Sequence, residues 1–248
     1  MVTEANDCPV ALITGGARRI GAVIAQSLHQ AGYQVIIHYH HSETDARALA
    51  HSLNQRRAHS AAIISADLNQ FAELESLITQ ARRQWGRLDV LVNNASSFFP
   101  TPVGATTAAQ WQDLINTNLT APYFLAQAAA EYLAQQQGCM INIADIHGER
   151  PLKGYPVYSI AKAGLIMLTK ALARELAPHV RVNAIAPGIA LLPEKPLSEN
   201  LITELKAKTL LKRFAQPQDI AHAVLFLLLQ SAMTGEILHI DAGRSLRQ

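Results

Sequence analysis

The chain contains few of the residues that indicate a secreted, membrane-spanning or nucleic-acid-binding protein. It has only two cysteines, Cys8 and Cys139, so a disulfide framework is not expected and a reducing cytosol fits. The 21 basic and 19 acidic side chains nearly cancel and form no basic patch, which argues against nucleic acid or an anionic membrane as a partner. The longest apolar runs, such as residues 223–229, are far shorter than the roughly 20 residues of a membrane span. The opening M-V-T-E-A-N-D lacks the basic and apolar regions of a secretory signal, and we expect a cytoplasmic protein.

Hydrophobic residues make up 49% of the 248 residues, enough to bury one large core. Short β-branched runs alternate with longer segments of helical periodicity. We expect strands at residues 10–14, 34–40, 61–66, 88–93, 140–144, 180–186 and 236–240, and helices at 20–31, 44–57, 74–83, 111–133, 157–176 and 219–229. This order predicts a single α/β domain over residues 1–248, a Rossmann-type, doubly wound parallel sheet of about seven strands with helices on both faces. Residues 187–210, with three prolines, are expected to form a substrate loop with a short helix that acts as a lid.

A glycine-rich turn, T-G-G-A-R-R-I-G at residues 14–21, lies between the first expected strand and the first expected helix. Glycines at such a turn let the backbone approach a pyrophosphate, and the helix N-terminus offers unpaired N–H groups. A glycine cluster alone is more often a tight turn. Its position at the first β-to-α turn favours dinucleotide binding.

The end of the second strand, H-Y-H-H-S at residues 38–42, indicates which nicotinamide cofactor is used. An NAD site usually places an acid here for the ribose 2′-OH, but the first acid in this chain is Glu43. His40, His41 and Ser42 can donate hydrogen bonds to a 2′-phosphate, and Arg18 adds a positive charge, so we expect NADPH. A solvated strand edge is the alternative for the histidines. A metal site is not expected, because no carboxylate or cysteine stands close enough in sequence to complete a ligand set.

Residues at the ends of the third, fourth and fifth strands are expected to converge on one crevice, because ligands bind outside the carboxyl ends of parallel strands. Asp67 and Leu68 would contact an adenine, and N-N-A-S-S-F-F at residues 93–99 would follow the fourth strand. Asp145 follows the fifth. Asn118 lies within a helical stretch, where an amide can simply bond the backbone.

Tyr158 and Lys162 are four residues apart, which places a phenol and an ammonium on one helical face. A nearby cation favours the phenolate, so we expect the pKa of Tyr158 to move from about 10 toward neutrality. Asp145 lies thirteen residues before the tyrosine. A half-buried tyrosine beside a solvated lysine is the structural alternative.

Together these segments resemble the short-chain dehydrogenase/reductase family over nearly the whole chain. The matching segments are Thr14-Gly15 through Gly21, Asn93-Asn94-Ala95, Asn118, Tyr158-x3-Lys162 and Pro187-Gly188. The chain looks like the pteridine reductase branch in particular. Most of the family has serine thirteen residues before the tyrosine, and this chain has Asp145 there. Most of the family has glycine or alanine at the middle glycine position of the turn, and this chain has Arg19. Further likenesses to that branch are H-Y-H around Tyr39, Asn94 to Phe98, and the P-L-x-G-Y run at residues 151–155. His41 departs from an arginine common in that branch, which weakens the expected 2′-phosphate binding at higher pH.

The resemblance implies hydride transfer from NADPH to a dihydropterin, an oxidised pterin or dihydrofolate. The implied catalytic residues are Asp145, Tyr158, Lys162 and Asn118, with Asn118 supporting a water that relays protons to Lys162. The substrate would contact Arg19, Ser96, Phe98, Asp145 and Tyr158; plain core packing is the alternative for Phe98. The implied cofactor-binding residues are Gly15, Arg18, Arg19, Ile20, Gly21, Tyr39, His40, His41, Ser42, Asp67, Leu68, Asn94, Ala95, Ser96, Tyr158, Lys162, Pro187 and Gly188.

Two other functions stay open from the sequence. One is a carbonyl reductase of the same fold that acts on a ketone, such as a 3-oxoacyl reductase. The other is a non-catalytic dinucleotide-sensing protein. The resemblance also implies a homotetramer formed through the long helices at residues 111–133 and 157–176. The basic tail at residues 244–248 would either reach a neighbouring subunit's site or fray.

Overall fold

The computed structural model, which describes residues 8–191 and 197–247, contains one seven-stranded parallel sheet in the order β3-β2-β1-β4-β5-β6-β7. The strands are β1 (Val10–Ile13), β2 (Gln34–Tyr39), β3 (Ala61–Ser65), β4 (Val90–Asn93), β5 (Cys139–Ile143), β6 (Arg181–Pro187) and β7 (Ile237–Ile240). All seven expected strands are therefore confirmed, with ends that shift by one or two residues. The five inner strands form because their short, mainly apolar runs are buried on both faces of the sheet, while the edge strands β3 and β7 are partly exposed.

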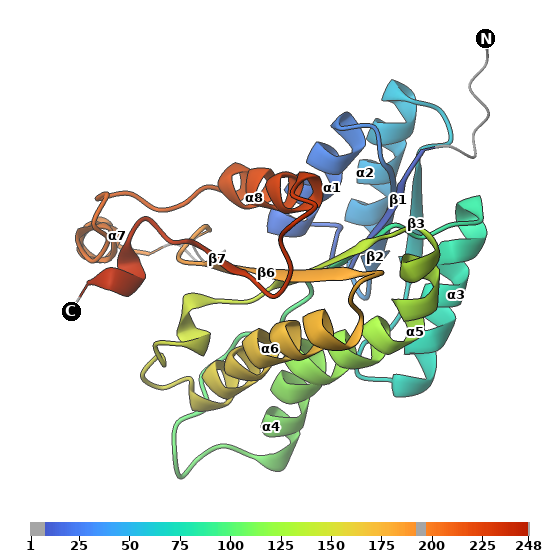
Figure 1. The fold of residues 1–248 in the computed structure, drawn as a ribbon. Helices are drawn as coiled ribbons and strands as arrows, with labels where there is room; N and C mark the ends of the chain where they lie inside the picture. The colour runs from blue at the N-terminus through green and yellow to red at the C-terminus, as the bar shows by residue number, and fades with distance from the viewer. Residues whose placement is uncertain (1–7, 192–196, 248) are drawn as a thin grey trace.

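Helices cover both faces of the sheet (Figure 1). They are α1 (Arg19–Gln30), α2 (Glu43–Arg56), α3 (Phe71–Trp85), α4 (Ala108–Ile115), α5 (Ala121–Gln135), α6 (Pro156–Glu175), α7 (Glu199–Ala207) and α8 (Pro217–Leu229). Alternation along β1 explains the two layers: Ala11 and Ile13 pack with α1, α2 and α8, while Val10 and Leu12 pack with α3 and α5. The Rossmann-type α/β architecture is confirmed.

The helix expected at residues 111–133 is interrupted. A single π-helical turn, η1 (Asn116–Thr120), separates α4 from α5. Pro122 is the physical reason, because it has no N–H to donate to the carbonyl of Asn118 four residues earlier. The interruption sets Asn118 inside the turn, where its side chain is buried.

The strand order reverses between β1 and β4, which places a crevice at the carboxyl ends of these strands. Beyond β6, the expected short helix is confirmed as α7, whose N-cap Ser198 accepts a hydrogen bond from the N–H of Leu201. Residues 192–196 of the expected lid lie outside the described residues, and the lid function stays a prediction. No described helix is long and apolar enough to cross a membrane.

Candidate active site

The turn between β1 and α1 depends on glycine at two positions. Gly15 adopts a φ of 59°, in the left-handed region that favours glycine. A Cβ on Gly21 would lie 2.3 Å from the carbonyl oxygen of Gly15 and 2.6 Å from Nδ2 of Asn94. Arg19 begins α1 with a φ of 53°, in the left-handed region that non-glycine residues adopt uncommonly.

Asn94, at the end of β4, holds this turn in place. Its Nδ2 donates to the carbonyl oxygens of Thr14, at 2.9 Å, and Gly15, at 3.1 Å. The hydroxyl of Thr14 accepts from the backbone N–H groups of Asn94 and Ala95, at 2.9 and 3.1 Å. The amide of Asn94 is thus committed to the protein backbone, so this residue shapes the cavity rather than offering its donors to a ligand.

His38 holds the turn from the other side, a function that the sequence did not reveal. Its Nδ1 lies 3.0 Å from the N–H of Gly15, and its Nε2 lies 3.1 Å from the carbonyl oxygen of Ala66. Since the Gly15 N–H can only donate, Nδ1 must accept and the Nε2–H must donate to Ala66. Burial lowers the pKa of His38 to about 4, so the neutral tautomer that this bridge requires persists at neutral pH.

A cavity of about 770 Å³ opens above the turn at the carboxyl ends of β1, β2, β3 and β4. Its lining includes most of the residues expected to bind cofactor: Gly15, Arg18, Arg19, Ile20, Gly21, His40, His41, Ser42, Asp67, Leu68, Asn94, Ala95 and Ser96. Five further lining residues were not foreseen: His38, Asn69, Ser97, Asp113 and Thr117. The volume and the helix N-terminus at one wall suit the adenosine and pyrophosphate of a dinucleotide.

Cations and acids both lie around the end of β2. Nε of Arg18 lies 3.8 Å from Asp45, with both side chains about half exposed, and Nδ1 of His40 lies 3.9 Å from Asp67. The hydroxyl of Ser42, the N-cap of α2, makes no capping hydrogen bond to that helix. His40, His41 and Ser42 all line the cavity. Residues 38–42, which end the strand, include no acid of the kind that an NAD site usually has there, although Asp67 also lines the cavity.

Besides Tyr158 and Lys162, three residues expected around the cofactor do not line this cavity. Tyr39 packs against the core under α1 and α2 and is not among the lining residues of the cavity. Pro187 ends β6. A Cβ on Gly188 would lie 2.9 Å from Cα of Asp241, so the described constraint on Gly188 is close packing between the ends of β6 and β7. A function of these three residues in cofactor binding stays a prediction.

Tyr158 and Asp145 meet at the start of α6. The Tyr158 hydroxyl donates to Oδ2 of Asp145 at 2.8 Å, while Oδ1 accepts from the backbone N–H of His147 at 2.8 Å. One turn along α6, Nζ of Lys162 donates to the carbonyl oxygen of Ile143 at 2.9 Å and lies 5.7 Å from the centre of the Tyr158 ring. Tyr158 is 5% exposed and Lys162 2%, so the alternative of a solvated lysine is wrong.

The expected direction of the Tyr158 pKa shift is also wrong. Burial is the largest cause that raises the pKa of Tyr158 well above its usual 10; the charge of Asp145 and the hydrogen bond to it act in the same direction, and only the hydroxyl of Ser96 opposes them. Burial lowers the pKa of Lys162 to about 8, partly offset by Asp145. The four-residue spacing predicted that Lys162 lies near Tyr158, but it could not predict that the Asp145 carboxylate lies against the phenol. Tyr158 is consequently a protonated phenol at neutral pH, suited to giving a proton.

Asn118 connects η1 to the loop after β4. Its Nδ2 donates to the carbonyl oxygens of Ser97, at 2.9 Å, and Leu114, at 3.0 Å. Its Oδ1 accepts from the Ser96 hydroxyl at 2.7 Å. The expected backbone bonding of this amide is confirmed. The water relay to Lys162 stays a prediction.

Phe98 forms an exposed aromatic wall beside Tyr158. Its ring is 54% exposed, stacks on Tyr155 with centroids 4.6 Å apart and 10° between the planes, and meets Tyr158 edge to face at 4.8 Å. Core packing is therefore the wrong interpretation of Phe98. An exposed ring next to a buried proton donor is suited to stacking a flat ligand.

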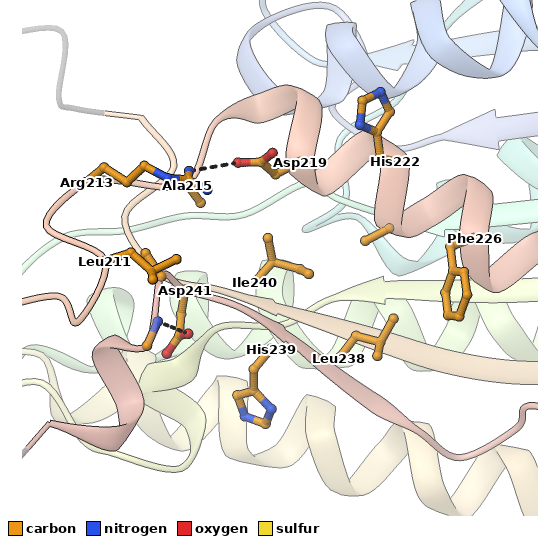
Figure 2. Close-up of a pocket in the computed structure, with 13 residues that line it drawn as sticks. Leu211, Arg213, Ala215, Asp219, His222, Phe226, Leu238, His239, Ile240 and Asp241 are labelled. Carbon is orange, nitrogen blue, oxygen red and sulfur yellow. Dashed lines mark hydrogen bonds and ion pairs between the residues drawn. The ribbon is translucent and has the colours of Figure 1, made fainter.

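Two observations concern the rest of the described structure. Among residues 8–191 and 197–247, no group of three histidine, cysteine or acidic side chains could hold a metal ion. A separate pocket of about 560 Å³ lies between α8 and β7 (Figure 2). Leu211, Phe226 and Leu238 line it, and Arg213 pairs with Asp219 at 3.7 Å at its rim. None of its lining residues belongs to the site expected from the sequence.

Comparison with known proteins gives consistent matches over nearly the whole chain. A family model described as enoyl-(acyl carrier protein) reductase matches residues 15–245. Pteridine reductase 1 of Leishmania tarentolae is 37% identical, and the alignment covers 99% of both chains. A 3-oxoacyl-acyl-carrier-protein reductase of Staphylococcus aureus is 36% identical over 94% of this chain and 96% of the relative. A putative ketoacyl reductase of the granaticin polyketide synthase from Streptomyces violaceoruber is 33% identical over 99% and 100%.

Proposed function

Because this chain belongs to the short-chain dehydrogenase/reductase family, whose reductases use a nicotinamide dinucleotide, we propose that it is an NADPH-dependent pteridine reductase. Its substrate would be a dihydropterin, an oxidised pterin or dihydrofolate. The chain is an oxidoreductase by family, and the choice of substrate and of NADPH is the proposal.

The observation that carries the proposal is the 2.8 Å hydrogen bond from Tyr158 to Asp145. A carboxylate suits a pterin, whose ring and amino N–H groups can donate hydrogen bonds to it. A serine hydroxyl at the same position suits the oxyanion that forms when a ketone is reduced. The open face of Phe98 beside the phenol offers a stacking surface for a flat ring.

The chemistry divides between the cofactor and this chain's own residues. NADPH supplies the hydride when bound. Tyr158, held as a phenol, gives its proton to the ring nitrogen of the C=N bond whose carbon receives the hydride. Asp145 orients the phenol and, as a carboxylate, can accept a hydrogen bond from an N–H of the pterin, and Lys162 would hold the nicotinamide ribose.

The cavity residues favour NADPH over NADH. His40, His41 and Ser42 line the cavity at the end of β2, a strand end whose residues 38–42 include no acid for a ribose 2′-OH, and Arg18 lines it too. These groups can donate to a 2′-phosphate. We expect kcat/KM for NADPH to exceed that for NADH at least tenfold, and equal values would contradict the cofactor assignment.

Reduction of a 3-oxoacyl substrate is the second candidate function. It is favoured by the relatives from Staphylococcus aureus and Streptomyces violaceoruber, which match almost as much of the chain as the pteridine reductase does. Asp145 counts against it, because a carboxylate is a poor partner for a developing oxyanion.

One assay separates the candidates. NADPH oxidation is followed with dihydrobiopterin, dihydrofolate and a simple β-keto ester in parallel. Turnover of either pterin at least tenfold above the keto ester is expected. Turnover of the keto ester alone would replace the proposal by the second candidate, and cofactor binding with no turnover would favour the dinucleotide-sensing alternative.

We further propose that the protein acts in the cytoplasm as a homotetramer. Exposed apolar side chains on the outer faces of α5 and α6, among them Tyr123, Phe124, Ile160 and Met167, support an assembly through these helices. Light scattering should give four times the mass of one chain, and Met167→Glu should lower it.

A further inference from the structure

A second, basic cavity lies next to the catalytic pair. It has a volume of about 440 Å³, and its wall is formed by three segments that are far apart in the sequence: residues 146–151, Lys208 after α7, and residues 244–247 at the C-terminal end. Its lining residues are Ile146, His147, Arg150, Pro151, Lys208, Arg244, Ser245 and Arg247. Four of these side chains are cationic, and none is acidic.

The cations of this cavity are incompletely neutralised. Lys208 pairs with Glu204 at 2.5 Å. Arg150 donates from Nη1 to the backbone carbonyls of Ser245 and Arg247, which positions the C-terminal turn without cancelling the charge. The nearby acid Glu149 is engaged by His239 at 3.0 Å instead.

Arg244 provides the observation that points to a ligand. Its Nη1 is buried and has no hydrogen-bond partner among the described residues. A buried guanidinium N–H without an acceptor is unfavourable, and native proteins satisfy such groups with protein, water or a bound ligand. Arg244 lines the cavity together with three other cations, so an anion is the kind of ligand that this charge would attract.

The position of the cavity connects it to catalysis. Its wall includes Ile146 and His147, the two residues that follow Asp145, and the N–H of His147 donates to the Asp145 carboxylate at 2.8 Å. The C-terminal turn and α7 lie together beyond the ends of β6 and β7 (Figure 1). The cavity is thus bounded by the same short segment that holds the Asp145 carboxylate.

We propose that this cavity is a subsite for the anionic end of the substrate, with Arg244 as its central donor. This inference rests on the proposed function: on a pterin, the anionic end is the glutamate carboxylate of a folate-type tail. The same chemistry is found in the phosphate of a phosphopantetheine arm, the source that a 3-oxoacyl substrate would supply. The subsite thus selects substrates with a charged tail over pterins with a short neutral side chain.

The kinetic test compares a charged and a neutral tail on the same ring. Arg244→Gln is expected to raise KM for dihydrofolate about tenfold and to leave KM for dihydrobiopterin and for NADPH within about twofold. Arg244→Lys keeps the charge and should recover part of the loss. Lys153→Gln is the matched control, because Lys153 is exposed in the same loop and does not line the cavity. Equal effects of Arg244→Gln on both pterins, or no effect on either, would overturn the assignment of the cavity to a carboxylate tail, and the binding test then decides between a phosphate subsite and no subsite.

A binding test does not depend on turnover. Calorimetry on the NADPH-bound protein measures the Kd of p-aminobenzoyl-glutamate and, separately, the Kd of pantetheine 4′-phosphate. Both are measured with wild type, Arg244→Gln and Lys153→Gln. Binding of the first that weakens about tenfold only in Arg244→Gln identifies a carboxylate tail. The same pattern with the second alone keeps the anion subsite and assigns it to a phosphate, whatever the outcome of the pterin assay. Binding of neither compound, or equal binding to all three proteins, excludes the subsite. If Arg244→Gln fails to fold, Arg247→Gln replaces it.

Discussion

Tyr158 and Asp145 are joined by a 2.8 Å hydrogen bond in which the phenol donates and the carboxylate accepts. This contact reverses the expected electrostatics of the tyrosine, because an adjacent negative charge and burial both disfavour the phenolate. Lys162 lies one turn away but directs its ammonium to the backbone at Ile143. The site is therefore arranged to hold a proton ready on Tyr158.

Asp145→Ser tests whether this carboxylate determines the substrate class. Pterin reduction should fall at least about tenfold, the typical share of one acid–base group, while NADPH binding is retained. Steady-state kinetics with dihydrobiopterin and a fluorescence titration of NADPH measure the two effects. A gain of keto-ester reduction in the same variant would strengthen the interpretation, and unchanged pterin turnover would remove it.

Lys162 should make NADPH binding depend on pH. Its pKa is lowered to about 8 by burial, so the ammonium that would hold the nicotinamide ribose loses its proton between pH 7 and pH 9. The Kd of NADPH for wild type should rise several-fold over this range. Lys162→Met should bind NADPH weakly at pH 7 and show no such rise, whereas parallel pH curves for the two proteins would assign the dependence to another group.

Gly21→Ala should weaken NADPH binding through the backbone alone. The added methyl group would lie 2.3 Å from the Gly15 carbonyl oxygen, so the turn has to move, and we expect the Kd of NADPH to rise at least tenfold. Gly32→Ala is the control. Gly32 has a φ of 98° but nothing within 4 Å of its Cβ position, so alanine there costs about 1 kcal/mol of strain and leaves the Kd unchanged. Equal Kd changes in the two variants would contradict the prediction.

The sequence predicted the strands and the glycine turn because both are local properties. The four consecutive buried residues of β1 are visible as an apolar run, and a glycine cluster after such a run has few structural uses. Residue spacing likewise placed Tyr158 beside Lys162. Four-residue periodicity is fixed by helix geometry.

Long-range placement is what the sequence could not supply. The pKa of Tyr158 depends on how deeply α6 buries the phenol and on which oxygen of Asp145 faces it. The basic cavity around Arg244 exists only because three distant segments meet. The break in the helix at Asn116–Thr120, by contrast, has a local signal in the sequence, because Pro122 lacks the N–H that a continuous helix needs.

His38 makes the stability of the fold depend on pH. Its neutral ring connects the glycine turn to the end of β3, and its pKa is about 4 when folded against 6.5 when unfolded. Between these values the unfolded chain binds more protons, so lowering the pH favours unfolding. As the pH falls from 6.5 to 4, the protonation of His38 in the unfolded chain should lower the free energy of unfolding by about 3 kcal/mol.

His38→Gln should remove this pH dependence, because glutamine does not titrate. Urea denaturation of wild type and His38→Gln at pH 7, 6 and 5 gives the difference between their free energies of unfolding. Burial also lowers the pKa of His29, but His29 is present in both proteins and cancels in that difference. The stability advantage of wild type should be largest at pH 7 and shrink as the pH falls. A difference that stays constant with pH would show that the His38 bridge is not the titrating group.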